Sequence, residues 1–190
     1  MVELAFSGLL DALIQHESKG DPTAISKKGA VGLTQVRPQY AHDLGYDTPS
    51  VFDVARKYGY DTGDETVEAA AQLLKVPEIS IEIGGEYLRN LIKKYDGDLN
   101  AALTAYNMGP KSYNEFAASG GDRSRLGVQA RNYPSNVAAE YLEATGEQMP
   151  MTIKLDPRLR PRARPEGVQI NEETSLRPRA RPARLLGAMK

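Results

Sequence analysis

Apolar residues recur at four-residue steps through the longest regular segment of this 190-residue sequence. The residues that share this face are Ile79, Ile83, Tyr87, Leu91 and Tyr95. A four-residue step is close to the period of an α-helix, and Pro77 suits the first turn of one. The spacing predicts a helix over about 78–95 that buries one side against other helices.

Further segments have helical patterns, and none alternates between apolar and polar residues for long. Leucines at helical spacing predict an amphipathic helix at 3–16. Other helices are expected near 36–44, 51–58, 66–74, 99–107, 111–118 and 135–145, with an irregular stretch at 119–133. A loop at 18–30 leads into a stretch near 27–35 that allows one short hairpin. The pattern predicts an all-α fold.

The composition allows one ordinary domain and excludes several kinds of site. Hydrophobic residues make up 41% of the chain, enough for the core of a domain of about 150 residues. The chain has no cysteine, which excludes disulfides and cysteine-ligated metal sites. The two histidines, His16 and His42, form no dense ligand motif. We therefore expect no metal and no cofactor.

The sequence changes character after Pro150. The string Leu-Arg-Pro-Arg-Ala-Arg-Pro occurs at 159–165 and again, unchanged, at 176–182. Frequent proline blocks helices and central strands, and a segment with few apolar residues cannot form its own core. We expect a domain at 1–150 followed by an extended basic tail at 151–190.

The charge is divided between these two parts. Residues 154–190 have ten basic and four acidic side chains, whereas the preceding residues have 14 basic and 21 acidic ones. The tail is either a solvated spacer or a docking segment for an acidic protein such as a virion partner, for nucleic acid or for membrane phosphates. The identical repeat favours docking. Nucleic acid is the weaker candidate, because the tail has no aromatic residue to stack on bases.

Neither a membrane span nor a signal peptide is expected. No apolar run approaches the roughly 18 residues that a transmembrane helix needs. The first residues include Glu3 and Asp11 and lack the basic stretch that opens a signal peptide.

Three short segments carry the functional signal. The first, at 14–18, reads Ile-Gln-His-Glu-Ser and contains Glu17; the second is the loop at 26–35, which ends in Gly-Leu-Thr-Gln. The third, at 103–110, reads Leu-Thr-Ala-Tyr-Asn-Met-Gly-Pro. In this order and spacing they resemble the lytic transglycosylases with a goose-lysozyme-like domain (glycoside hydrolase family 23). The resemblance covers roughly residues 4–145.

The resemblance implies that Glu17 is the acid of a peptidoglycan-cleaving site. A carboxyl group protonates a glycosidic oxygen at neutral pH only if an apolar, partly dehydrated site raises its pKa. Glu17 stands where the apolar face of the first helix ends, which is compatible with a place at a cleft edge. A glutamate at a helix end is ordinarily a solvated surface residue. The surrounding motif favours the catalytic role.

The resemblance also implies substrate-binding roles for Ser26, Gln35, Tyr106, Asn107 and Tyr133. Ser26 and Gln35 match positions that hydrogen-bond sugar near the scissile bond. A Tyr106 hydroxyl aimed at Glu17 would orient the acid and tune its pKa. Asn107 offers a donor and an acceptor to an N-acetyl group.

The sequence departs from the family pattern at several positions. Thr34 and Arg37 stand where methionine is common, which predicts a more polar cleft wall. Gln129 replaces a frequent glutamate four residues before Tyr133, so the clearest candidate for a second acid is missing. Pro134 replaces a usual valine, and we expect it at a helix start, where proline is tolerated.

With one acid, the resemblance implies a lytic transglycosylase that cleaves the MurNAc-β-1,4-GlcNAc bond. Glu17 would protonate the glycosidic oxygen, and its carboxylate would then deprotonate the muramyl C6 hydroxyl to close a 1,6-anhydro ring. A goose-type lysozyme-like hydrolase of the same bond is one alternative, since glycosidases usually use two carboxylates. A non-enzymatic glycan-binding or assembly module that acts through the tail is another. Without an export signal, we expect a phage virion-associated enzyme that is ejected into the host periplasm, or export by a partner.

Overall fold

The structure is a computed structural model that describes residues 2–154; the repeats of the tail lie outside this range. The described residues form α-helices, two short 3-10 helices and no strand, which confirms the predicted all-α class. The helices are α1 (Val2–Ser18), η1 (Pro38–Tyr40), α2 (Val51–Lys57), α3 (Val67–Leu73), α4 (Pro77–Lys94), α5 (Leu99–Met108), α6 (Pro110–Ala118), η2 (Arg123–Arg125) and α7 (Val128–Thr145). No helix among residues 2–154 is both long and apolar enough to cross a bilayer.

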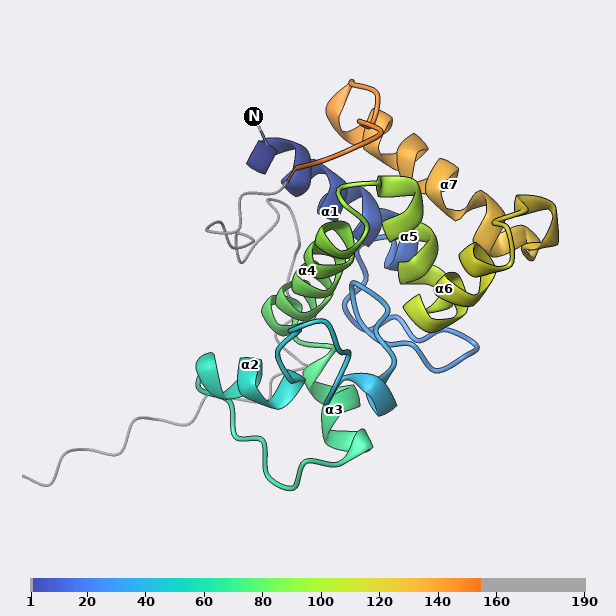
Figure 1. Ribbon diagram of the computed structural model, residues 1–190. Helices are drawn as coiled ribbons and strands as arrows, with labels where there is room; N and C mark the ends of the chain where they lie inside the picture. The colour runs from blue at the N-terminus through green and yellow to red at the C-terminus, as the bar shows by residue number, and fades with distance from the viewer. Residues whose placement is uncertain (1, 155–190) are drawn as a thin grey trace, which may run out of the picture.

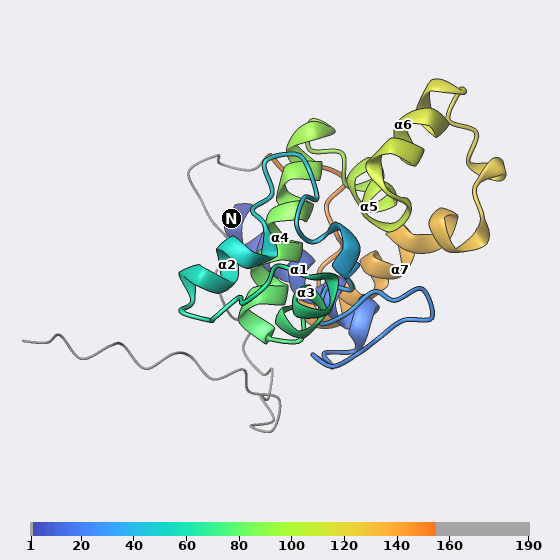
Figure 2. The ribbon, with the colours of Figure 1, turned by 90° about the horizontal axis from the view of Figure 1, so that it is seen from below.

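Helix α4 is shared by two hydrophobic clusters. Its side chains Leu88, Leu91 and Ile92 pack in a cluster with α1, α5 and α7. Its earlier residues Ile79 and Ile83 pack in a second cluster with α2, α3 and the loop before η1. Accordingly, α2 and α3 lie to one side of α4, whereas α5, α6 and α7 lie to the other (Figures 1 and 2). The predicted helix over 78–95 is confirmed, and it supports both halves of the domain.

Helix ends are fixed by ordinary capping chemistry. The side chain of Ser50 accepts a hydrogen bond from the backbone of α2, and Thr66 and Asp98 do the same for α3 and α5. Pro77 and Pro110 open α4 and α6, where their missing N–H has no helical partner to lose.

Helix α7 begins earlier than the sequence pattern predicted. It begins at Val128 rather than near 135, so part of the stretch predicted to be irregular is helical. Pro134 therefore lies inside the helix rather than at its start. A proline there removes one helical hydrogen bond, but its buried ring adds to the packing of α7.

The loop between α1 and η1 also differs from expectation. The hairpin allowed near 27–35 does not form strands; Val31 makes only isolated bridges, to Ile25 and Val36. The helix expected near 36–44 shrinks to η1, three residues opened by Pro38.

The domain core continues past the expected boundary at residue 150. Ile153 is buried in the cluster with α1, and its backbone N–H donates to the Gly97 carbonyl at 3.0 Å. Thr152 forms a bridge with Asp98. A side chain on Gly97 would stand 2.5 Å from the carbonyl oxygen of Ile153 and break this contact. The described part of the expected tail thus packs on the domain.

Candidate active site

Glu17 lies in the last turn of α1, with its carboxyl group largely withdrawn from solvent. Burial raises the pKa of Glu17 to about 7, and a hydrogen bond from the Tyr133 hydroxyl partly opposes this rise. Burial disfavours the charged form, whereas a donor to the carboxylate favours it. The group is therefore balanced between acid and base near neutral pH.

Tyr133 is the residue that orients this carboxyl group. It projects from α7 and is 1% exposed. Its ring meets His16 edge-on, with centroids 5.0 Å apart and planes at 86°. Burial, followed by the nearby Glu17 charge, raises the pKa of Tyr133 well above its ordinary value. The hydroxyl thus keeps its proton and remains a donor to Glu17.

Tyr106 does not have the orienting role that the sequence suggested. Its hydroxyl donates to the backbone carbonyl of Thr34 at 2.9 Å rather than to Glu17. It is still a close neighbour of the acid, because burial and then the Glu17 charge raise the pKa of Tyr106. Tyr106 thus ties α5 to the loop before η1 and lines the surroundings of the acid.

Ser26 and Gln35 make their hydrogen bonds within that same loop. The Gln35 side-chain amide donates to the carbonyls of Ala24 and Gly32, at 3.1 and 2.9 Å. Ser26 Oγ accepts from the backbone N–H of Ala30 at 2.9 Å. Gln35 also has a positive φ of 51°, an uncommon conformation for a residue with a side chain. These bonds hold the loop together. The Gln35 amide oxygen and the Ser26 hydroxyl proton have no partner among the described residues.

The expectation that Thr34 makes the cleft wall more polar is wrong. It is fully buried, and its hydroxyl donates to the Ser80 carbonyl at 2.9 Å. A Cβ on Gly84 would stand 2.3 Å from Thr34 Cβ, so α4 approaches the loop closely at this glycine. The threonine therefore fixes the loop on α4 and does not face a substrate.

Asn107 completes the predicted set. It follows Tyr106 near the end of α5, is half-buried, and has no hydrogen-bond partner among residues 2–154. In the described part of the chain, no group of three or more His, Cys, Asp and Glu side chains is arranged so that it could hold a metal ion. At the candidate site, the Glu17 carboxyl group accepts a hydrogen bond from the Tyr133 hydroxyl.

Sequence reasoning missed the Tyr133–Glu17 bond and the packing of Thr34 on Gly84. The first depends on where α7 begins, because a helix from Val128 turns Tyr133 inward toward α1. The spacing of Tyr133, Val137 and Tyr141 was the available signal, since these residues share a helical face.

Comparison with known proteins gives the family. A family model described as the transglycosylase SLT domain matches residues 6–125. The chain belongs to this family. The match includes Glu17 and the 103–110 segment but ends before α7, so it does not reach Tyr133.

Curated relatives of this SLT-domain chain are longer proteins. Endo-type membrane-bound lytic murein transglycosylase A of Klebsiella pneumoniae is 39% identical over 80 residues, 42% of this chain and 32% of the relative. Peptidoglycan transglycosylase gp16 of Escherichia phage T7 is 30% identical over 132 residues, 68% of this chain and 9% of the relative. Membrane-bound lytic murein transglycosylase C of Pectobacterium atrosepticum is 31% identical over 136 residues, 68% of this chain and 34% of the relative. The chain thus spans about a third or less of the length of these relatives.

Solved structures share the fold of this SLT domain. The 70 kDa soluble lytic transglycosylase Slt70 of Escherichia coli matches with a TM-score of 0.54 and 24% identity, covering 76% of this chain and 23% of that protein. An inactive mutant of the lytic transglycosylase Slt of Pseudomonas aeruginosa matches with a TM-score of 0.52 and 21% identity, over the same shares.

Proposed function

We propose that this chain is a peptidoglycan lytic transglycosylase that cleaves the MurNAc-β-1,4-GlcNAc bond. The observation that carries the proposal is the carboxyl group of half-buried Glu17, which has a pKa of about 7 and accepts a hydrogen bond from Tyr133. A general acid is most effective when its pKa is near the working pH. Membership of the SLT-domain family supports the same substrate, as do the names of the curated relatives, which are murein and peptidoglycan transglycosylases.

Glu17 acts first as an acid and then as a base. The protonated carboxyl group gives its proton to the glycosidic oxygen, and the GlcNAc part of the strand leaves as an alcohol. The muramyl acetamido group stabilises the positive anomeric carbon. The Glu17 carboxylate then takes the proton of the C6 hydroxyl, whose oxygen bonds to the anomeric carbon and closes the 1,6-anhydro ring. Glu17 ends protonated, and no water is consumed.

The residue at position 129 favours this route over hydrolysis. Enzymes that use a water or a carboxylate nucleophile place a second carboxyl group within about 10 Å of the acid. By resemblance, Gln129 occupies the position of the family's frequent glutamate. A goose-type lysozyme activity remains the second candidate, and its products would have reducing ends.

The proposed binding roles rest on polar groups of the loop and of α5 that have no partner among the described residues. A role for Asn107 in binding an N-acetyl group is supported by its amide, which has no partner among the described residues. Hydrogen bonds made by Ser26, Gln35 and Tyr106 stabilise the loop between α1 and η1. The polar atoms of these residues that remain unpaired could contact the sugar. Tyr133 contributes by orienting the acid.

The direct test is the loss of lysis in Glu17→Gln. We expect this variant to fold and to leave purified cell walls turbid, whereas Glu143→Gln, on the exposed side of α7, clears them like the wild type. A Glu17→Gln protein that lyses walls at the wild-type rate would refute the assignment.

We further propose a phage setting, in which a virion-associated protein opens the host wall locally. The similarity to gp16 of phage T7 supports this setting. Mass spectrometry of purified virions should detect the chain, and virions that lack it would refute the proposal. Docking through the tail, to an acidic virion protein or to nucleic acid, concerns residues outside the described range and stays a prediction.

A further inference from the structure

A row of tyrosine rings leads away from the candidate acid. Tyr106, beside Glu17, meets the Tyr87 ring at a centroid distance of 5.3 Å. Burial raises the pKa of Tyr87, and the phenol groups of Tyr46 and Tyr95 raise it further. We call Tyr106, Tyr87, Tyr95 and Tyr46 the tyrosine row. It runs from the acid along α4 to the surface.

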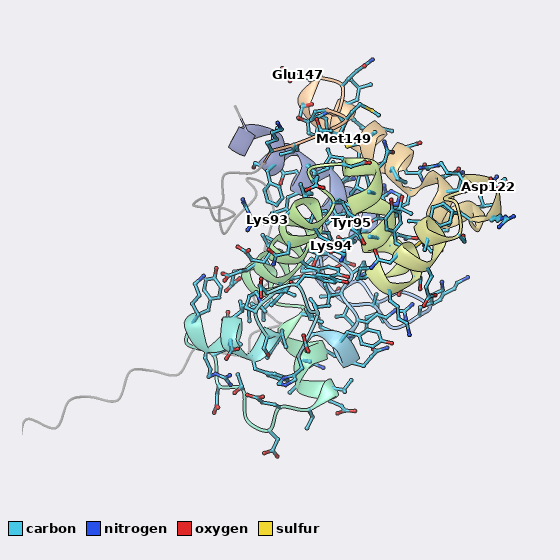
Figure 3. The ribbon with its side chains drawn as sticks, viewed as in Figure 1. Lys93, Lys94, Tyr95, Asp122, Glu147 and Met149 are labelled. Carbon is cyan, nitrogen blue, oxygen red and sulfur yellow. The ribbon has the colours of Figure 1, made fainter. Side chains whose placement is uncertain are left out.

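The outer end of the row holds a lysine between two rings. Lys94 Nζ lies 4.7 Å from the Tyr46 ring centroid and 5.6 Å from that of Tyr95. Figure 3 labels Lys93, Lys94 and Tyr95 together at the end of α4. A cation near two ring faces is attracted by both, so the ammonium group is held in place without a carboxylate.

Lys94 is exposed and forms no ion pair among the described residues. Lysines elsewhere do so: Lys57 pairs with Glu82 at 2.6 Å and Lys19 with Glu140 at 2.7 Å. The three N–H donors of Lys94 therefore remain available to an acceptor from outside.

The two tyrosines are held by independent means. Tyr46 is 36% exposed and has a φ of 57°, a conformation that is uncommon for a residue with a bulky side chain. The Tyr95 hydroxyl donates to Asn114 Oδ1 at 3.0 Å, and its ring packs edge-on against Tyr113 of α6 at 4.9 Å. Helix α6 thus helps to position the Tyr95 ring beside Lys94, whereas Tyr46 reaches Lys94 from the loop before α2.

A ligand that suits this surface combines an apolar ring face with a negative group. Aromatic rings offer sugars a flat apolar surface, and an ammonium group bonds well to a carboxylate. We propose that Lys94, held between Tyr46 and Tyr95, binds a carboxylate of the glycan strand in a subsite at the outer end of the tyrosine row. This inference rests on the proposed function, which makes the glycan strand the ligand. The carboxylate belongs either to the lactyl group of muramic acid or to the stem peptide.

The test measures binding separately from cleavage. Full-length protein with Glu17→Gln, so that the strand stays intact, is titrated calorimetrically with three probes. They are a neutral N-acetylglucosamine hexamer, glycan strands whose peptides have been removed by an amidase, and strands that keep their peptides. Lys94→Gln is compared with Lys93→Gln, a neighbouring exposed lysine on α4, and with Lys94→Arg, which keeps the charge.

We expect Lys94→Gln to weaken binding of strands that bear the relevant carboxylate about fivefold, as an exposed ion pair would. Binding of the neutral hexamer should not change, and Lys94→Arg should bind nearly as well as the parent. The lactyl carboxylate is free only in the amidase-treated strands, because the peptide is amide-linked to it in the others. Weaker binding of the peptide-free strands alone therefore assigns the lactyl carboxylate, and weaker binding of the peptide-bearing strands alone assigns the stem peptide. Weaker binding of both strand probes shows that Lys94 accepts a carboxylate from either source. An unchanged affinity for all probes, or an equal loss that includes the hexamer, overturns the inference. A failure of the proposed function shows separately, as an absence of cleavage by the protein with Glu17 intact.

Discussion

Replacing Glu17 by glutamine should stabilise the domain at neutral pH while removing activity. The folded-state pKa is about 7, against an ordinary value of 4.5. Each pKa unit corresponds to about 1.4 kcal/mol, so the burial of the charged form costs about 3 kcal/mol once the group is ionised. The amide introduced by Glu17→Gln has no charge to bury, and its oxygen can accept the same bond from Tyr133.

The sign of this effect depends on pH. Below pH 4.5 the carboxyl group is protonated in both folded and unfolded chains, so folding buries no charge and the wild type keeps its full stability. Between pH 4.5 and about 7 the unfolded chain loses its proton first, and the folded wild type loses stability as the pH rises. The advantage of Glu17→Gln should therefore be small at pH 4.5 and reach about 3 kcal/mol at pH 8. For a domain of this size that is roughly 6–12 °C in Tm.

The assay is equilibrium unfolding in denaturant at pH 4.5 and pH 8, for the wild type and Glu17→Gln. Glu143→Gln provides the matched control, because Glu143 is exposed and has no partner among the described residues. Its difference from the wild type should be the same at both pH values. A Glu17→Gln advantage that does not change with pH, or a variant less stable than the wild type at pH 8, would refute the reasoning.

Three further outcomes are expected. Tyr133→Phe removes a hydrogen bond to the carboxylate worth about 1.5–3 kcal/mol, so the pKa of Glu17 should rise by roughly one to two units. The alkaline limb of the pH–rate profile should move to higher pH by the same amount. An unmoved limb would contradict the bond, and Tyr40→Phe, at an exposed tyrosine, is the control. Gly84→Ala should lower the free energy of unfolding by about 1–3 kcal/mol, because the new Cβ would overlap Thr34. The control is Gly127→Ala, whose Cβ meets no atom within 4 Å and which should cost only about 0.5 kcal/mol, because glycine is preferred to alanine at this N-cap of α7. Equal effects in denaturant unfolding would count against the close approach of α4 to Thr34. Tyr106→Phe should lower the free energy of unfolding by about 1 kcal/mol, because it loses the hydrogen bond to the Thr34 carbonyl. It should shift the pH–rate profile less than Tyr133→Phe does. A larger shift would mean that Tyr106, and not Tyr133, orients Glu17.

The fold was predictable wherever local patterns determine it. The four-residue steps of α4 and the capping residues before α2, α3 and α5 define those helices within a residue or two. The start of α7 was not predictable in this way. Pro134 argues locally for a helix boundary, and only tertiary packing of Tyr133 and Val137 against α1 and α5 keeps the helix continuous through it.

The residues of the candidate site were easier to predict than their contacts. The motif around Glu17 predicted a catalytic acid there, and the structure raises the pKa of this carboxyl group, but which tyrosine reaches it depends on how α5 and α7 pack on α1. Thr34 shows the same limit: a polar residue in a loop suggests an exposed wall, yet contact with Gly84 and Ser80 buries it. Partners so distant in sequence leave no local signal.

The central claim is tested most directly by mass spectrometry of the soluble products from purified peptidoglycan treated with the wild type and with Glu17→Gln. The account predicts 1,6-anhydromuropeptides from the wild type and none from the variant. Reducing-end muropeptides from the wild type, or no products from either folded protein, would contradict it.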